Sequence, residues 1–544
     1  MTSSDKVSSD SVSEITTGNA VVWAILGIIA IYLATALAGY PQYATQLAST
    51  GHDDHAGEQH AATEQAVAED VSTAPPFWTI IPFVLLLGAI ATFPLMHNTE
   101  HWWENNLHRF YVAAGLGVLT LSYYAFLHRA SVEIHWPGHS VTPVVDGGVQ
   151  IGFVRAILVN AILSEFVPFI VLLFSLYTIA GGIRIEGDLR ADSVTNATIM
   201  GVGAVLASLI GTTGAAMLLI RVLLETNRER KHVAHTVIFF IFIVCNCGGC
   251  LLPIGDPPLF LGYLQGVHFL WTLNLWPSWL TVNGLLLLVY LIMDRFFFHS
   301  KETIRDIERD IEQTRKLRIT GLKLNGSLLI GVVLAVALLD PNKAVPGTNW
   351  HAWMYLREIV QLGLVAVSLY FGQKSVRVAN DFSFGAIIEV AALFIGIFIC
   401  MQPALQILSE KGELIASKLS PGGYFWATGA LSSFLDNAPT YLVFFETAQI
   451  PGKGGPTAGV PEAILVSISL GAVFMGAMTY IGNGPNFMVK AIAEKSNVKM
   501  PSFFGYMVYS CLILLPILVF DQWQNFESEP PPSKAETAMV QQAE

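Results

Sequence analysis

The chain has 544 residues, of which 53% are hydrophobic and only 13% are charged, and its mean hydropathy is +0.54. Charged residues alone approach about a quarter of a soluble globular domain, so this composition excludes a soluble enzyme and indicates an integral membrane protein. The formal net charge of −12 comes partly from the termini and from the loop at 40–75. It says little about partners, and no nucleic acid partner is expected.

Apolar runs close to the roughly 20 residues that cross a bilayer recur along the chain. About eleven spans are predicted, at 21–39, 76–94, 110–127, 157–182, 233–263, 269–294, 327–340, 357–372, 384–407, 461–493 and 503–521. Two more segments, 198–224 and 425–448, are interrupted near their centres by Gly, Thr, Asn, Asp and Pro. Lipid cannot satisfy the backbone groups freed by such breaks. We therefore interpret both segments as re-entrant hairpins buried by protein, within an all-α polytopic membrane protein.

In chain order, these elements form five parts: 1–75 with a cytoplasmic N-terminus, the first span and a polar external loop; 76–296 as a first transmembrane repeat; 297–326 as a cytoplasmic linker helix; 327–521 as a second, inverted repeat; and 522–544 as a polar C-terminal tail. The linker is expected to be helical because Ile304, Ile307 and Ile311 form an apolar stripe. An uncleaved first span is favoured over a cleaved signal peptide, since residues 1–20 contain one Lys and several acids.

The repeat is predicted from matching helix breakers and acids in the two halves. Thr213 and Asn437 are 224 residues apart, as are Glu165 and Glu389, and Gly255 and Gly482 are 227 apart. The residues expected to break helices are Gly211, Gly214, Gly255, Pro257, Pro258, Pro439, Gly482, Gly484 and Pro485. Broken helices at corresponding positions of two halves point to a transport site at the bilayer midplane.

Charge predicts the orientation. If successive spans cross the membrane in alternating directions, most of the 29 Lys and Arg residues lie on the same side as the N-terminus. This side is expected to be cytoplasmic, because cytoplasmic loops carry an excess of Lys and Arg. The first hairpin then enters from the cytoplasm and the second from outside. The two halves are therefore inverted relative to each other.

Asp436 is the strongest candidate for the site. Inserting an acid at the bilayer centre costs roughly 2.5–3.5 kcal/mol of free energy, so an acid found there suggests a function. With Asn437, Thr440 and carbonyls freed by Pro439, it offers the oxygen ligands that a hard cation such as Na⁺ prefers. The alternative is that Asp436 caps the helix at the hairpin tip. The metal prediction is confined to Na⁺ at Asp436 and Asn437.

The candidate ion or substrate ligands are polar residues at the four breaks: Thr212, Thr213, Asn246, Asp256, Asp436, Asn437, Thr440, Asn483 and Asn486. Asp256 and Asn483 occupy equivalent places in the two unwound helices. Helix N-termini there would favour an anion and carbonyl ends a cation, so both signs of ligand remain open.

Glu165 and Glu389 form a second acidic pair that, with Asp436, is expected to couple protons. They are alternatively structural acids bonded to backbone breaks or to a buried Arg.

Cys245, Cys247 and Cys250 lie close together in one apolar stretch. Packing of small residues is favoured there over a metal cluster.

The sequence does not suggest an enzyme. It contains no His-Glu-x-x-His metalloprotease motif. A phosphate loop and a large soluble domain are also missing, which disfavours an ATP-driven pump.

Three motifs carry a family resemblance: Ile254-Gly-Asp-Pro-Pro-Leu-Phe-Leu-Gly262, Ser432-Ser-Phe-Leu-Asp-Asn-Ala-Pro-Thr440 and Gly482-Asn-Gly-Pro-Asn486. Over roughly 76–521 the chain resembles the ion transporter superfamily, and within it the NhaD-like sodium/proton antiporters and related citrate transporters. The resemblance implies paired inverted repeats with two hairpins and two discontinuous helices. It also implies a homodimer in the lipid of the inner (cytoplasmic) membrane, an elevator motion, and no cofactor beyond transported Na⁺ and H⁺.

NhaD-like antiporters usually carry an acid in the first hairpin, whereas 211–216 has none. The favoured function is antiport of Na⁺ or Li⁺ against H⁺, with Asp436 alternating between cation and proton. The alternative is Na⁺- or H⁺-coupled transport of citrate or a dicarboxylate. No Lys or Arg lies in the four central motifs, which favours the cation over the small carboxylate as substrate.

Overall fold

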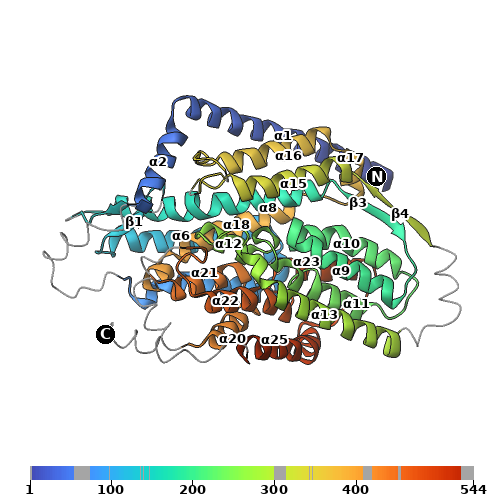
Figure 1. Ribbon diagram of the computed structural model, residues 1–544. Helices are drawn as coiled ribbons and strands as arrows, with labels where there is room; N and C mark the ends of the chain where they lie inside the picture. Colours follow the sequence, from blue (N-terminus) through green and yellow to red (C-terminus); the bar gives the residue numbers. More distant parts are fainter. Residues whose placement is uncertain are drawn as a thin grey trace.

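The computed structural model describes residues 3–53, 74–96, 98–134, 136–138, 140–145, 148–298, 314–341, 343–345, 347–408, 419–450 and 455–527. Helices dominate these residues, beside two small antiparallel sheets. One sheet pairs β1 (Val132–Ile134) with β2 (Ser140–Thr142), and the other pairs β3 (Arg184–Asp188) with β4 (Arg315–Thr320). Figure 1 shows β1 at one end of the helical body and β3 and β4 at the opposite end.

The helices fall into two sets, one before and one after the gap at 299–313. The first set is α1 (Ser3–Leu37), α2 (Tyr40–Asp53), α4 (Ile81–Thr92), α5 (Glu100–Trp103), α6 (Asn106–Phe126), α7 (Ile151–Leu158), α8 (Val167–Ala180), α9 (Ser193–Ile210), α10 (Thr212–Thr226), α11 (Ala234–Ile243), α12 (Pro257–Leu264) and α13 (Trp276–Met293). The second set is α15 (Leu322–Leu338), α16 (Leu356–Phe371), α17 (Lys374–Ala379), α18 (Gly385–Cys400), α20 (Pro421–Ser432), α21 (Asn437–Ala448), α22 (Glu462–Met475), α23 (Gly484–Lys495), α24 (Phe503–Tyr509) and α25 (Leu515–Glu527).

Shorter helical pieces connect or interrupt these elements. The 3₁₀ turns are η2 (Phe77–Ile80), η3 (Phe93–Leu95), η5 (Cys247–Cys250), η6 (Pro253–Gly255), η7 (Trp271–Leu275) and η10 (Gly476–Met478). The π-helical turns are η4 (Val159–Phe166), η8 (Asp294–Phe298) and η11 (Ser510–Leu514).

Five helical stretches among the described residues are long and apolar enough to cross a membrane, or six if one bent pair is a single span. They are Asn19–Leu37, Ile151–Ala180, Ser193–Ile210, Trp271–Phe298 and Phe503–Asn525, and the pair is Gly385–Cys400 with Gln402–Leu408, bent by 43°. Four shorter apolar helices accompany them. Large side chains such as Ile31, Leu280 and Leu512 are exposed on these helices, as expected for surfaces that face lipid.

Each segment that the sequence marks as interrupted contains two helices joined by a short turn. α9 ends at Ile210 and α10 begins at Thr212, so Gly211 alone makes the turn, with a φ of 81° that favours glycine. α20 ends at Ser432, and Asp436 precedes the start of α21. The two helices of each segment pack against each other.

Two apolar helices also stop within the helical body and resume after an irregular stretch. α11 gives way to η5 and η6 before α12 begins, and α22 gives way to η10 before α23 begins. A β-carbon at Gly255 would collide with the carbonyl of Gly249 and the backbone of Ser208, and one at Gly482 with the carbonyls of Gly476 and Ser432. Glycine is therefore required at both breaks, since only a hydrogen fits there.

The structure corrects two local predictions. Residues 315–320, expected to lie within the linker helix at 297–326, form strand β4, which pairs with β3 through Arg184 opposite Thr320 and Ile185 opposite Ile319. The apolar stripe from Ile304 to Ile311 lies outside the described residues.

The polar loop expected after residue 40 begins as helix α2, and Thr45 of α2 accepts a hydrogen bond from the backbone N–H of Met354. Tertiary contact thus overrides the local composition at both places.

Candidate functional site

Four helices begin around one buried carboxyl group. The N-cap or first residue of each is Thr212 in α10, Asp256 in α12, Asn437 in α21 and Asn483 in α23. The N-terminus of a helix carries partial positive charge and free N–H groups. The convergence therefore stabilises negative charge at Asp256, which is only 1% exposed.

Side chains from the other three helix starts donate to the Asp256 carboxylate. Thr212 Oγ1 donates to Oδ1 at 2.9 Å, and Asn483 Nδ2 approaches the same oxygen at 3.2 Å. Asn437 Nδ2 donates to Oδ2 at 2.7 Å. Thr212 and Asp256 precede the gap at 299–313, while Asn437 and Asn483 follow it, so the carboxylate joins the two halves of the chain.

A chain of amides extends from this carboxylate. Asn483 Nδ2 is 3.2 Å from Asn246 Oδ1, and Asn246 Nδ2 donates to Asn486 Oδ1 at 2.8 Å. Asn486 Nδ2 in turn donates to the carbonyl of Gly476 at 2.9 Å. All these groups are buried. Each of these three amide nitrogens has a partner, so the hydrogen bonds fix the positions of the side chains relative to one another.

One polar atom in the cluster has no hydrogen-bond partner within the described part of the chain. Asn437 Oδ1 is buried and unpaired, although the nitrogen of the same amide is bonded to Asp256. An amide oxygen is a good ligand for a hard cation, as are a carboxylate and a hydroxyl. Asp256, Thr212 and Asn437 together therefore form an oxygen-rich set that could hold a small cation.

Residues 128–526 match a family model described as "Putative citrate transport". This chain belongs to that citrate transport family. The match spans more than half of the chain and includes all four breaks. No curated protein matches the chain. Family membership together with the apolar helices makes the chain a multi-pass membrane transporter.

In this member of the citrate transport family, six of the nine predicted ligands form the connected cluster: Thr212, Asn246, Asp256, Asn437, Asn483 and Asn486. The other three lie beside it. Asp436 is half-buried and caps α21, its Oδ1 accepting from the Ala438 N–H at 3.1 Å. Thr440 donates to the carbonyl of Asp436 at 3.0 Å, and Thr213 is half-buried next to Thr212. The structure thus brings Asp256, rather than Asp436, into direct contact with both halves.

The two predicted relay acids have different surroundings. Glu389 pairs with Arg109 of α6 at 2.8 Å. Glu165 lies on the π-helical turn η4, and its Oε2 is buried without a hydrogen-bond partner in the described residues. π-helical turns are frequent at functional sites.

Sequence reasoning overlooked Glu446, a third acid that interacts electrostatically with Glu165. It lies on α21, ten residues after Asp436. Its presence in an otherwise apolar stretch was the available signal.

A second buried acid that sequence reasoning overlooked is Asp294, at the start of η8. It accepts from Arg230 Nη2 at 2.5 Å and from Ser193 Oγ at 2.7 Å, and it lies 2.8 Å from His235 Nε2. These bonds tie the starts of α9 and α11 to the end of α13. The signal was an acid at the edge of an apolar span together with the basic run at 228–231.

The predicted helix breakers lie at the turns just described. Gly211, Gly255 and Gly482 are required by the backbone; Gly214 lies in the first turn of α10; Pro257 and Pro258 begin α12; Pro439 lies in the first turn of α21; Gly484 and Pro485 begin α23. Proline is tolerated in the first turn because the N–H groups there are unpaired in any case. Glycine and proline therefore start these half-helices at the carboxylate.

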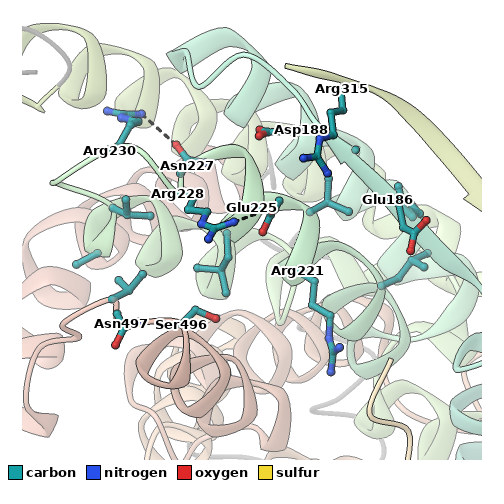
Figure 2. A pocket seen from close by; sticks show the side chains of 18 of the residues that line it. Glu186, Asp188, Arg221, Glu225, Asn227, Arg228, Arg230, Arg315, Ser496 and Asn497 are labelled. Carbon is teal, nitrogen blue, oxygen red and sulfur yellow. Dashed lines mark hydrogen bonds and ion pairs between the residues drawn. The ribbon is translucent and has the colours of Figure 1, made fainter. Parts of the chain in front are cut away.

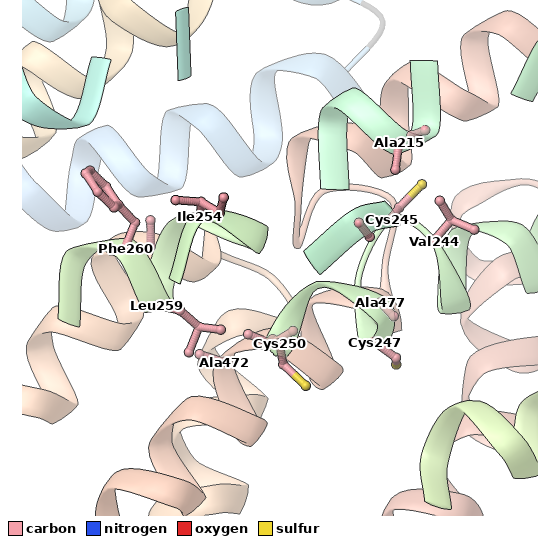
Figure 3. Packing of buried hydrophobic residues seen from close by; sticks show 14 of the residues in the cluster. Ala215, Val244, Cys245, Cys247, Cys250, Ile254, Leu259, Phe260, Ala472 and Ala477 are labelled. Atoms are coloured by element: carbon pink, nitrogen blue, oxygen red, sulfur yellow. The ribbon is translucent and has the colours of Figure 1, made fainter. Parts of the chain in front are cut away.

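The three neighbouring cysteines pack as apolar side chains. Figure 3 shows Cys245, Cys247 and Cys250 among Ala, Val, Leu, Ile and Phe residues, with side chains that do not converge on one point. All three are fully buried and free. Within the described ranges no group of three or more His, Cys, Asp or Glu residues could hold a metal ion. The three thiols thus contribute apolar surface to the packing at this helix break.

Proposed function

We propose that the chain is a secondary active transporter that exchanges Na⁺ or Li⁺ for H⁺, with Asp256 at the centre of its cation site. The observation that carries this proposal is a single buried carboxylate held by side chains from both halves, beside an unpaired amide oxygen. Such a group binds either a cation or a proton. Competition between the two at one carboxylate is what an antiporter needs.

The amides provide a route between the two states. Rotating an Asn amide by half a turn exchanges its nitrogen and oxygen. In the structure, Asn437 Nδ2 donates to Asp256; after rotation, Asn437 Oδ1 would face the same place and complete an oxygen site with Asp256 and Thr212. Asp436, next to Asn437 and in electrostatic interaction with Asp256, adds a second negative charge.

The chain architecture supports alternating access. Each half contains a hairpin of two packed helices and an interrupted helix, and glycines 227 residues apart, Gly255 and Gly482, make the same close approach in each. We include in the proposal the inverted repeats, the elevator motion, the homodimer and the cytoplasmic membrane. The charge-based orientation would place β3 and β4 in the cytoplasm and β1 outside.

The second candidate is cation-coupled transport of citrate or a dicarboxylate. The family description favours it, as do the four positive helix ends, which also suit an anion. Against it stands the charge of Asp256, which would repel a carboxylate unless a cation or proton neutralised it. The hydrogen-bond partners of the six-residue cluster are amide, hydroxyl, carboxylate and backbone groups, and none is a Lys or Arg.

A vesicle assay separates the two functions. Everted vesicles that contain the protein are energised to acidify their interior, and a pH-sensitive dye reports the gradient while Na⁺, Li⁺, K⁺ or citrate is added in turn. We expect Na⁺ and Li⁺ to collapse the gradient and K⁺ and citrate to have no effect. In parallel, uptake of labelled citrate is measured with and without Na⁺. Citrate accumulation without cation-dependent proton movement would replace the proposal with the second candidate.

A further inference from the structure

A large basic cavity opens at the end of the molecule that carries β3 and β4. Its volume is about 1340 Å³, and its walls come from β3, α10, the start of α11, the end of η8, β4 and residues 496–499. Figure 2 shows labelled side chains from several of these elements around the opening, among them Arg221, Arg228 and Arg315. None of the six cluster residues, Asp256 included, lines it, so it is separate from the proposed transport site.

The cavity wall is strongly positive. Nine Lys or Arg residues line it, against three Asp or Glu residues. Some of the basic groups are already neutralised: Arg184 by Glu186, Arg221 by Asp381, Arg228 by Glu225 and Arg230 by Asp294.

Four of the basic residues form no ion pair with any residue in the described part of the chain. They are Arg315, Lys316 and Arg318 of β4 and Lys499. All four are exposed. Because β4 and Lys499 belong to separate elements, the residues that the structure describes leave positive charge without an acidic partner on two walls of the cavity.

The cavity lies at the end of a candidate membrane span. α10 ends and α11 begins beside it, and η8, the last turn of the Trp271–Phe298 span, closes one wall. Phe298, Val498 and Tyr509 supply apolar area among the charges. Basic pockets between transmembrane helices at this depth bind anionic lipid headgroups.

We propose that this cavity binds a phosphate-bearing anion. Arginine presents a planar fork of N–H donors that matches phosphate oxygens, and lysine adds point charge. The volume exceeds the roughly 300–1,000 Å³ of an ordinary small-ligand pocket, so it accommodates a headgroup with part of its glycerol. A membrane phospholipid and a soluble phosphate compound share this chemistry, and the experiment distinguishes them.

The test compares two matched double variants of the full-length protein in detergent. K316Q/K499Q removes two of the unpaired cavity charges. K323Q/K374Q removes two exposed lysines that do not line the cavity, so the net charge changes equally. Thermal unfolding is followed while short-chain phosphatidylglycerol, short-chain phosphatidylcholine or inorganic pyrophosphate is added.

We expect phosphatidylglycerol to raise the unfolding temperature of the wild type and of K323Q/K374Q, and phosphatidylcholine to have little effect. In K316Q/K499Q, half of the full shift should require at least about fivefold more phosphatidylglycerol, since each Lys near an anionic surface contributes about 1 kcal/mol. A shift with pyrophosphate that shows the same variant pattern also supports the site and identifies a soluble ligand. No shift with either anion, or equal shifts in the two double variants, would overturn the proposal.

Discussion

Asn437 donates its side-chain N–H to Asp256 at 2.7 Å, and this bond connects a hairpin in the second half of the chain to an unwound helix in the first. The two residues are 181 positions apart in the sequence. The same carboxylate accepts from Thr212 of the first hairpin. If one half moves relative to the other, the bond between Asn437 and Asp256 must therefore break, unless the hairpin and the unwound helix move together.

We expect Asp256→Asn to abolish Na⁺-dependent proton exchange. The amide keeps the size of the side chain but carries no charge for Na⁺ and takes up no proton. Membrane insertion should not suffer, because removing a central acid relieves roughly 2.5–3.5 kcal/mol. The measurement is Na⁺-dependent dye dequenching in vesicles with equal amounts of protein. Asp521→Asn, a change at a buried acid of α25 that accepts hydrogen bonds from Gln522 and Asn525 rather than from the cluster, is the control and should retain exchange. A D256N rate within about twofold of wild type would move the cation site elsewhere.

Asp436→Asn should weaken the response to Na⁺ without abolishing it. Asn still caps α21, because its side-chain oxygen accepts from Ala438 N–H as the carboxylate does. The lost charge near Asp256 should raise the Na⁺ concentration for half-maximal exchange roughly tenfold, equivalent to about 1.4 kcal/mol. The measurement is a Na⁺ titration at constant pH. An unchanged titration would leave Asp436 with the capping role alone, and complete loss would make it an equal partner of Asp256.

The two relay candidates should behave differently. Glu165→Gln removes one carboxylate of the Glu165 and Glu446 pair, so the profile of exchange rate against pH should shift or flatten. Glu389→Gln breaks an ion pair with Arg109 and should lower thermal stability while leaving the pH profile in place. Both profiles are measured between pH 6 and pH 9, a range of about three units chosen around neutrality. An altered profile for E389Q with an unaltered one for E165Q would reverse these roles.

Asp294→Asn should be the most destabilising of these changes. It removes the buried carboxylate charge that Arg230 Nη2 contacts at 2.5 Å, and breaking a buried ion pair by removing one partner costs about 3–5 kcal/mol. Arg228→Gln disrupts the exposed pair with Glu225, at 3.5 Å, and should cost less than about 1 kcal/mol. The readout is thermal unfolding in detergent. Equal unfolding temperatures for D294N and R228Q would contradict the structural role of the buried pair.

Much of the site was predictable from the sequence because its residues break rules of the lipid environment. Gly255, Asp256, Asn437 and Asn483 stand out in apolar segments where each would be costly without a partner. Residue type and spacing alone thus identified six residues that the structure brings together. Glu446 and Asp294 were missed because each lies close to the end of an apolar segment, where the sequence does not show whether an acid is buried.

The sequence by itself determined the class of protein, the positions of the breaks and the polar groups that surround them. It did so because hydropathy and helix breaking are local properties of short segments. Only the tertiary structure decided that Asp256, rather than Asp436, accepts hydrogen bonds from both halves. It also decided that β4 pairs with β3 and that basic residues from distant segments share one cavity. These outcomes depend on contacts between residues more than a hundred positions apart, and local composition carries no information about which distant partner a side chain will meet.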